Sequence, residues 1–331
     1  MKIAIRYPDD CHVHLRQGAM LEAVAPATDR QCFRALVMPN TDPPILTVAD
    51  AERYRQRILE ARTAFMPIMT VKLVPSTTPE IIRAARGMVR AGKLYPEGVT
   101  TNSDDGVSDF SRMFPVFETM EETGMALCLH GETPGVFSLD RETTFLKTLR
   151  IIASTFPKLK IVLEHVTTAD AVREIERLPD NVAATITVHH LYLTLDDIIG
   201  GSLRPHAFCK PVAKRPEDRD ALIAAATGGN PKFFLGTDSA PHSRGRKECD
   251  GGCAGIFSAP VAIQALASVF ERRDALGSLE GFTSRYGAGF YGWPLCESKL
   301  TLVREPWTAP DDRHGVVPFM AGQTLDWRIE E

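Results

Sequence analysis

The sequence predicts an α/β protein with a (β/α)8 barrel, and three observations support this fold class. Short apolar segments alternate with longer amphipathic segments along nearly the whole chain. The short segments are almost continuously apolar, which is typical of parallel strands that helices cover. Seven or eight such units are present in 331 residues, which fits a closed barrel of about 250 residues with insertions. The absence of a Gly-rich dinucleotide fingerprint and of a P-loop weakens the open-sheet alternatives.

The expected elements follow one another in chain order. Buried strands are predicted at 32–39, 64–73, 93–96, 125–130, 160–165, 182–190 and 232–238. Amphipathic helices are predicted at 48–62, 78–92, 110–124, 141–156, 168–178 and 258–276. No linker rich in Ser and Gly separates these segments, so we expect one domain over residues 1–331. A tail after about residue 280 is expected to pack a last helix and some strands onto the barrel.

Composition and charge exclude several classes of function. Hydrophobic residues make up 44% of the chain and charged residues 24%, as in an ordinary soluble domain. The formal net charge is −4, so no basic field is available to hold nucleic acid. No apolar run reaches about 18 residues, and therefore neither a membrane span nor a membrane partner is expected.

The cysteines indicate a reducing compartment. The chain contains 7 cysteines, scattered and odd in number, which predicts reduced thiols and a cytoplasmic protein. Cys249 and Cys253 in ECDGGCAG suggest half of a zinc ribbon, but no second close pair completes four ligands. We interpret this segment as a loop with two thiols.

Histidines and an aspartate stand at the ends of predicted strands. His12 and His14 lie two residues apart in DDCHVHLRQG, so their side chains share one side of an extended segment. His130 ends MALCLH, His165 ends KIVLEH and Asp238 ends FFLGTD. The carboxyl ends of parallel barrel strands share one face, where active sites lie. A lone histidine is more often a packing residue, but this set at one rim predicts a metal site.

The ligand types indicate the metal. Imidazole and carboxylate ligands without thiolate suit Zn²⁺ or a similar first-row ion. One catalytic zinc uses three protein ligands and keeps an open position, so five candidate ligands indicate two ions that share a bridging hydroxide. Two cations also need an anionic bridging side chain, which a histidine cannot supply. The doublet His189–His190 also ends a predicted strand, and we interpret it as structural or supporting.

Short motifs in a fixed order complete the pattern. They are HVHLR after PDD, MPNT (38–41), KLYP (93–96), TTNS (100–103), HGE (130–132), EHVTT (164–168), RPH (204–206), GTDSAPH (236–242) and GCAG (252–255). Each is weak alone, but together they resemble the amidohydrolase superfamily almost from end to end. More narrowly, the chain resembles the dihydroorotase family of the shorter, second bacterial type.

The resemblance implies a barrel with two zinc ions per subunit, bridged by a carboxylated lysine and a hydroxide. His12, His14 and Asp238 would bind the more buried ion, and His130 and His165 the second. Lys93 in KLYP would be the bridge, as N6-carboxylysine. Without the family, Lys93 would be interpreted as an ordinary surface lysine. A homodimer is also implied.

The family reaction is the reversible cyclisation of N-carbamoyl-L-aspartate to L-dihydroorotate, the third step of pyrimidine synthesis. The hydroxide would attack the ring amide carbonyl, and Asp238 would carry its proton to the departing nitrogen. The resemblance also implies substrate contacts, with the backbone of Lys210 and Ala254 at the amide edges and a carboxylate clamp that includes Arg16. The implied substrate-binding residues are Arg16, Asn40, Thr100, Thr101, Lys210, His242 and Ala254.

Three alternatives remain open from the sequence. A hydantoinase or allantoinase would share the histidine pair and the lysine, but Arg16, Asn40 and His242 favour a substrate with a carboxylate beside its ring. A non-catalytic barrel that serves as a partner in a pyrimidine-pathway complex would be expected to have lost ligands. The segment 98–107 could be a lid over the substrate or an ordinary surface loop.

Overall fold

The central sheet closes into a barrel. The computed structural model describes residues 1–61 and 63–330. Its 8-stranded sheet is parallel, with neighbours in chain order: β2 (Asp9–Val13), β3 (Arg34–Val37), β4 (Met66–Leu73), β5 (Val89–Leu94), β6 (Ala126–His130), β7 (Ile161–Glu164), β8 (Val182–Ile186) and β9 (Phe233–Leu235). The two edges meet, because Val13 bridges Ser239 and the amide of Asp238 donates to the carbonyl of His12 at 2.8 Å. The predicted (β/α)8 fold is therefore confirmed.

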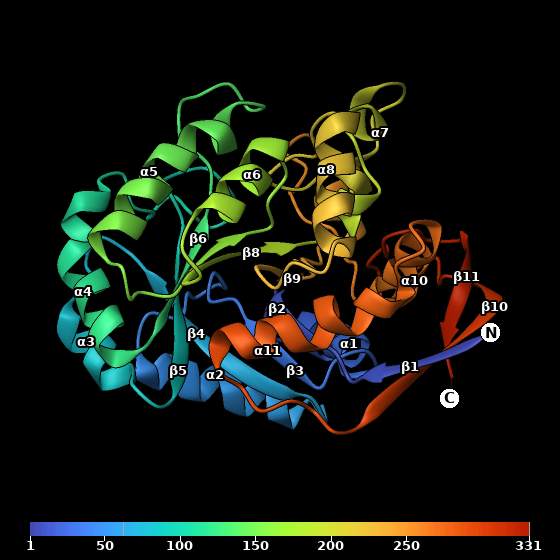
Figure 1. Ribbon diagram of the computed structural model, residues 1–331, viewed down its shortest axis with the longest axis horizontal. Helices are drawn as coiled ribbons and strands as arrows, with labels where there is room; N and C mark the ends of the chain where they lie inside the picture. The colour runs from blue at the N-terminus through green and yellow to red at the C-terminus, as the bar shows by residue number, and fades with distance from the viewer. Residues whose placement is uncertain (62, 331) are drawn as a thin grey trace.

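Helices surround the outer face of the barrel, as Figure 1 shows. They are α1 (Ala19–Asp29), α2 (Val48–Glu60), α3 (Pro79–Ala85), α4 (Phe114–Thr123), α5 (Arg141–Thr155), α6 (Ala169–Arg177), α8 (Pro216–Thr227) and α10 (Ala262–Arg272). Their apolar sides and the outward side chains of the strands form the main core. Two shorter helices, α7 (Asp196–Ile199) and α9 (Arg244–Lys247), lie in the connections that follow β8 and β9. None of the described helices is both long and apolar enough to cross a bilayer.

A second apolar cluster fills the barrel interior. Small and medium side chains such as Cys11, Ala91 and Phe234 point inward from the strands. Aromatic side chains of α11 (Tyr286–Tyr291) pack against this cluster. Gly287 is in such close contact with the strands that a Cβ there would lie 2.6 Å from Cys11 Sγ. The helix thus closes the amino-terminal end of the barrel and leaves the opposite end for loops.

A small antiparallel sheet lies beside the barrel. It pairs β1 (Lys2–Arg6) with β10 (Lys299–Thr308), and β10 with β11 (Thr324–Ile329). Figure 1 shows that both chain ends lie at this sheet. Trp327 of β11 is fully buried, and its indole N–H donates to Glu271 of α10 at 3.0 Å. This contact attaches the last strand to the helical layer of the barrel.

Two predicted elements were wrong in part. The helix expected at 78–92 ends at Ala85, and residues from Val89 onward belong to β5. Gly87 has φ of 93°, a conformation that favours glycine and interrupts the helix. The strand expected at 182–190 ends at Ile186, and the histidine doublet lies in a 3-10 turn at His189–Leu191.

Other differences concern element boundaries and omissions. The helix predicted at 48–62 is α2, and Arg62 lies outside the described residues. Neither α1 nor α8 was predicted from the sequence. Pro26 inside α1 and the weak amphipathic pattern of α8 obscure their periodicity, so the packing of these helices on the sheet decides their structure.

Candidate metal centre and active site

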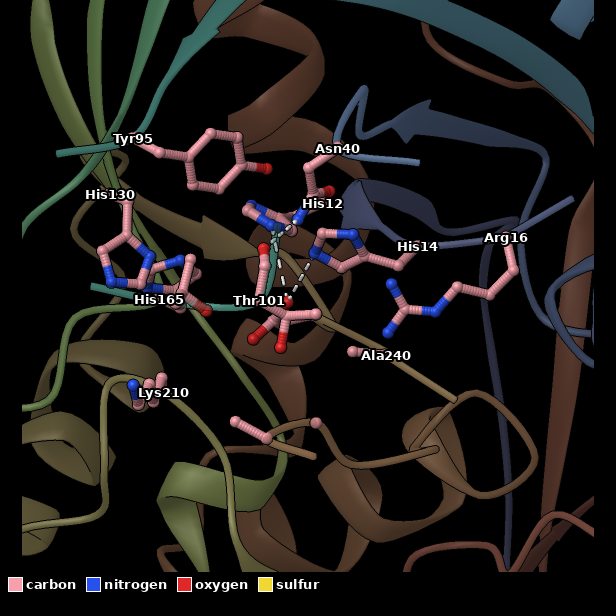
Figure 2. Close-up of a pocket in the computed structure, with 14 residues that line it drawn as sticks. His12, His14, Arg16, Asn40, Tyr95, Thr101, His130, His165, Lys210 and Ala240 are labelled. Carbon is pink, nitrogen blue, oxygen red and sulfur yellow. Dashed lines mark hydrogen bonds and ion pairs between the residues drawn. The ribbon is translucent and has the colours of Figure 1, made fainter. Parts of the chain in front are cut away.

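The predicted site residues gather at the carboxyl ends of the barrel strands, around one narrow cavity. Figure 2 shows four imidazole rings directed toward a common space, with Arg16 on one side and Lys210 on the other. The predicted residues that line this cavity are His12, His14, Arg16, Asn40, Thr100, Thr101, His130, His165, Lys210, Asp238 and Ala254. His242 lines an adjoining hollow that also contains Arg16. Lys93 lies below the cavity surface and is fully buried.

His12, His14 and Asp238 form a group whose possible ligand atoms lie within 4.8 Å of one another. Nε2 of His14 is 3.1 Å from Oδ1 of Asp238, and Nε2 of His12 is 3.5 Å from the same oxygen. All three side chains are buried. Two imidazoles and a carboxylate at this spacing match the ligand set of a zinc ion.

His130 and His165 lie next to this group. Their ring centroids are 4.7 Å apart, and the ring of His165 is 5.1 Å from that of His12. Nδ1 of His165 is buried and has no hydrogen-bond partner among the described residues. A buried nitrogen without a partner is costly, and a metal ion would satisfy it.

Lys93 is the least usual member of the site. It lies on β5 with no accessible surface, and its Nζ has no hydrogen-bond partner among the described residues. The amine lies 4.8 Å from the centroid of the Tyr95 ring. Burial lowers the pKa of Lys93, while Glu164 and Cys128 oppose that shift. The site therefore fits a group that modifies or contacts this amine and that the protein chain does not supply.

The electrostatics of the group favour metal ligation. Burial lowers the pKa of His14 to about 4 and that of His165 well below its ordinary value, so both rings are neutral near pH 7. Burial alone would raise the pKa of Asp238, but the hydrogen bond from His14 and the nearby imidazoles place it well below the ordinary range. Neutral imidazole and ionised carboxylate are the forms that bind a metal.

Two acidic residues that the sequence analysis did not identify orient the histidines. Glu164 Oε2 lies 2.8 Å from Nδ1 of His12, and Glu132 Oε2 lies 2.7 Å from Nε2 of His130. An ionised carboxylate can only accept, so each of these ring nitrogens carries the proton and the other nitrogen is left for a ligand. The sequence did contain an indication of a special role for Glu164, because it is an acidic residue inside an otherwise apolar strand.

The backbone turns sharply where several site residues leave their strands. Arg16, His165 and Asp238 have φ of 61°, 42° and 44°, in the left-handed region that non-glycine residues seldom adopt. Such conformations persist where the surrounding structure holds them, and they occur preferentially at functional sites. At Gly236, two residues before Asp238, a Cβ would lie 2.9 Å from His12 Cβ. Close approach of the last strand to the first therefore requires glycine here.

Arg16 lines the opposite side of the cavity, and His242 contacts it from the adjoining hollow. Nε of Arg16 donates to the carbonyl of Pro241 at 2.9 Å, and one terminal nitrogen lies 3.0 Å from Nε2 of His242. The same His242 nitrogen lies 3.0 Å from the carbonyl of Ala254. Burial and the charge of Arg16 lower the pKa of His242 to about 3. The guanidinium is thus held by the protein while it faces the cavity, which suits recognition of a carboxylate.

The loop at 98–107 covers the cavity rather than projecting into solvent. Lys72 Nζ donates to the carbonyl of Asn102 at 2.8 Å. Asn40 Nδ2 donates to the carbonyl of Thr101 at 3.4 Å, and Asn102 Nδ2 to the carbonyl of Asn40 at 3.1 Å. The space that remains beneath it is about 20 Å³, room for about one water molecule. A cyclic amide substrate does not fit in this space as it stands.

A second buried group, His189, His190 and Cys209, also lies close enough to hold an ion. The ring nitrogens of His190 already contact the hydroxyl of Thr187 at 2.9 Å and the carbonyl of Pro211 at 3.0 Å. Burial raises the pKa of Cys209 to about 12, so its thiol stays protonated. We therefore attribute this group to the packing of the 187–191 turn. Cys249 is exposed and belongs to neither group.

Comparisons with known proteins identify the family. A search against profiles of protein families finds no match. A dihydroorotase of Teredinibacter turnerae is 48% identical over 335 residues, which cover 98% of this chain and 97% of that protein. A dihydroorotase of Picosynechococcus sp. is 50% identical over 341 residues, which cover 99% and 98%. The chain belongs to the dihydroorotase family.

Solved structures agree with this family assignment. The crystal structure of a Saccharomyces cerevisiae dihydroorotase in complex with 5-fluoroorotic acid superposes with a TM-score of 0.94 at 39% identity, covering 99% of this chain and 98% of that one. An Arthrobacter aurescens L-hydantoinase has a TM-score of 0.85 but only 16% identity, and this likeness shows the fold alone. As a dihydroorotase family member, the chain is a hydrolase that acts on cyclic amide bonds of a small-molecule substrate. The resemblance drawn from the sequence motifs is confirmed, and the histidine-rich donor set agrees with a metal-dependent family.

Proposed function

We propose that this cavity binds two zinc ions and interconverts N-carbamoyl-L-aspartate and L-dihydroorotate. One observation carries the proposal. Buried imidazoles, an ionised carboxylate and a fixed guanidinium line one cavity, and a buried amine without a hydrogen-bond partner among the described residues lies beneath its surface. Metal ligands beside a carboxylate-binding group suit a cyclic amide that bears a carboxylate on its ring.

The ligands divide between the two ions by their positions. His12, His14 and Asp238 bind the more buried ion, supported by their mutual spacing. His130 and His165 bind the second ion, through the ring nitrogens that their neighbours leave free. When bound, the ions supply a Lewis acid for the amide carbonyl and a water of lowered pKa.

Lys93, once carboxylated, would be the residue that holds the two ions together. Its neutral amine would add to the carbon of CO₂ and the nitrogen would release one proton, so that a neutral amine is replaced by a carbamate anion. The burial of Nζ and its lack of a partner support this assignment. The carbamate supplies the anionic oxygens that two adjacent cations need and that the histidines lack.

Asp238 transfers the proton of the reaction. In ring opening it accepts a proton from the attacking water and passes it to the amide nitrogen that departs. In ring closure the same carboxylate moves the proton in the opposite sense. Its position against both His12 and His14 and its ionised state support this role.

The remaining residues bind the substrate. Arg16, Asn40 and His242 hold the free carboxylate, while backbone groups of Lys210 and Ala254 contact the amide edges. Thr100 and Thr101 donate hydrogen bonds from the loop 98–107, which opens for entry and closes to exclude water. The small free volume beneath the present loop supports this lid role.

The substrate assignment is tested by comparing turnover of L-dihydroorotate, hydantoin and allantoin with the purified, zinc-loaded protein. We expect dihydroorotate to be preferred by at least about 10²-fold in kcat/KM, because only its carboxylate can use the Arg16 fork. Arg16→Met should remove most of this preference. Hydantoin as the better substrate would instead indicate a hydantoinase.

Metal content distinguishes the enzyme from a non-catalytic barrel. We expect elemental analysis of carefully purified protein to give close to two zinc ions per chain. Chelation should abolish turnover, and added zinc should restore it, because the ligand set remains in place without the ions. Less than one bound zinc per chain together with no turnover would favour the non-catalytic alternative.

The chain is further proposed to be a single domain over residues 1–331, to act in the cytoplasm and to form a homodimer. Pairing of β1 with β10 connects the two chain ends in one sheet and supports the single domain, although Glu331 lies outside the described residues. The absence of disulfides among its cysteines supports a reducing compartment. The homodimer rests on the family resemblance, and light scattering of the purified protein tests it.

A further inference from the structure

Lys247 is a buried lysine outside the metal-ligand group. It ends the short helix α9 and is 4% exposed, whereas Arg244 and Arg246 on the same turn are exposed. It does not line the narrow cavity, and none of the described carboxylates forms an ion pair with it. A buried ammonium without a carboxylate is costly unless other groups satisfy it.

Three backbone carbonyls satisfy the ammonium. Nζ of Lys247 donates to the carbonyl oxygens of Phe208 at 2.9 Å, of Cys253 at 2.8 Å and of Gly255 at 2.8 Å. Each of the three N–H groups therefore has one acceptor. Burial lowers the pKa of Lys247 to about 8, so the amine still carries all three hydrogens in most molecules near pH 7.

These carbonyls belong to the two backbone segments that form one wall of the cavity. Phe208 lies two residues before Lys210, and Cys253 and Gly255 flank Ala254 on either side. Lys210, Ala254 and Gly255 line the cavity. One side chain that does not line the cavity thus binds the backbone of both segments.

Other hydrogen bonds also hold the wall, since the amide of Cys253 donates to the carbonyl of Arg246 at 2.9 Å and the ring of His242 lies 3.0 Å from the carbonyl of Ala254. The amide of Gly255 donates to the carbonyl of Phe208 at 3.0 Å, which joins the two segments directly. At the far end of the first segment, the ring of His190 lies 3.0 Å from the carbonyl of Pro211. Neither segment belongs to a strand or an α-helix, so regular hydrogen bonding does not fix its backbone. The Lys247 ammonium is the group that ties the segments at three points.

We propose that Lys247 is a positioning residue for substrate recognition, which holds the backbone of Lys210 and Ala254 at the separation that fits the two amide edges of the ring. The inference rests on the proposed function, because that function assigns these two backbones to the substrate. Lys247 itself touches neither the substrate nor the metal ligands. A hydrophobic side chain of similar length would fill the same space but could not bind the three carbonyls. The ammonium group is therefore what fixes the positions of the two segments.

The test compares Lys247→Met with the control Arg244→Met on the same helix, each loaded with zinc. Methionine has a similar length but no N–H, and Arg244 is an exposed residue outside the cavity. We expect Lys247→Met to lower kcat/KM for dihydroorotate by about 10- to 100-fold, mostly through KM, since small displacements of positioning groups have effects of this size. Zinc content should match the control. Hydrogen exchange should be faster at 208–211 and 252–255 only.

Each outcome separates positioning from a structural role. A lower melting temperature with unchanged kcat/KM per zinc-loaded chain would overturn the proposal, as would unchanged exchange in both segments. Lys247→Gln, which retains two N–H donors, should give an intermediate KM and provides a milder second variant. Failure of both variants to fold would make Lys247 a folding residue and would also overturn it. If the parent protein does not turn over dihydroorotate, the proposed function fails, independently of Lys247.

Discussion

Replacing Lys93 by alanine is expected to abolish turnover, with kcat/KM for dihydroorotate falling by at least about 10³-fold. The substitution removes the nitrogen that is proposed to carry the anionic bridge, and two adjacent cations without such a bridge repel one another. The several kcal/mol of transition-state stabilisation that metal ions supply would be lost with them. Steady-state kinetics and elemental analysis on the same sample measure both effects, and we expect zinc to fall to one ion per chain or less.

Lys72 offers a matched control for this variant. It is also a fully buried lysine, it lies opposite Lys93 in the register of β4 and β5, and its Nζ contacts Asn102 and Asp105 of the covering loop. Lys72→Ala should therefore raise KM by loosening the loop while zinc stays bound. The contrast separates loss of a buried lysine in general from loss of the bridge.

Chemical rescue of the Lys93→Ala variant provides a second test of the bridging role. Alanine leaves a space beneath the metal group, because Lys93 has no accessible surface in the parent protein. A short carboxylate such as propionate can enter this space and supply two anionic oxygens, so added propionate should restore part of the activity and of the zinc binding. Full activity of Lys93→Ala without any additive would contradict the bridging role.

The barrel fold and the gathering of most candidate site residues at one cavity could be predicted from the sequence, because the apolar strands and the residues that end them can be recognised there. In a parallel barrel every strand ends at the same face. A histidine or aspartate that ends or follows an apolar strand therefore reaches that face, however the helices are packed. His130, His165 and Asp238 all follow this rule. His189 and His190 did not follow it, because their strand ends at Ile186 and the chain turns before reaching them.

The groups that orient the ligands could not be predicted in the same way. Glu164 and His12 are far apart in the chain, and only the closure of the barrel brings their atoms to 2.8 Å. Sequence periodicity indicates which side of a strand a residue occupies, but not which partner lies across the barrel. The left-handed backbone conformation at Asp238, with φ of 44°, cannot be predicted from the sequence either, because the surrounding structure rather than local propensity imposes it. The burial of Lys247 is likewise not apparent from the sequence, because its neighbours Arg244 and Arg246 are exposed.

Asparagine at position 238 is expected to reduce kcat by about 10²- to 10⁴-fold, the usual effect of removing a general acid–base. Asparagine has the shape of aspartate and keeps an oxygen that can face Nε2 of His14, now 3.1 Å from Oδ1. It cannot accept a proton near neutral pH, so proton transfer stops while the substrate can still bind. Because the substitution cannot change the reaction equilibrium, kcat/KM must fall by the same factor in ring opening and ring closure.

Asp9→Asn provides the control for Asp238→Asn. Asp9 is also a buried carboxylate, but it begins β2 at the closed end of the barrel and pairs with Arg34 at 2.6 Å. Weakening this ion pair should lower the melting temperature without changing kcat of the folded enzyme. Asp238→Asn should lower kcat without lowering the melting temperature. Its affinity for dihydroorotate, measured by calorimetry, should change only a few-fold. A kcat within tenfold of the parent value at normal zinc content would show that another group moves the proton.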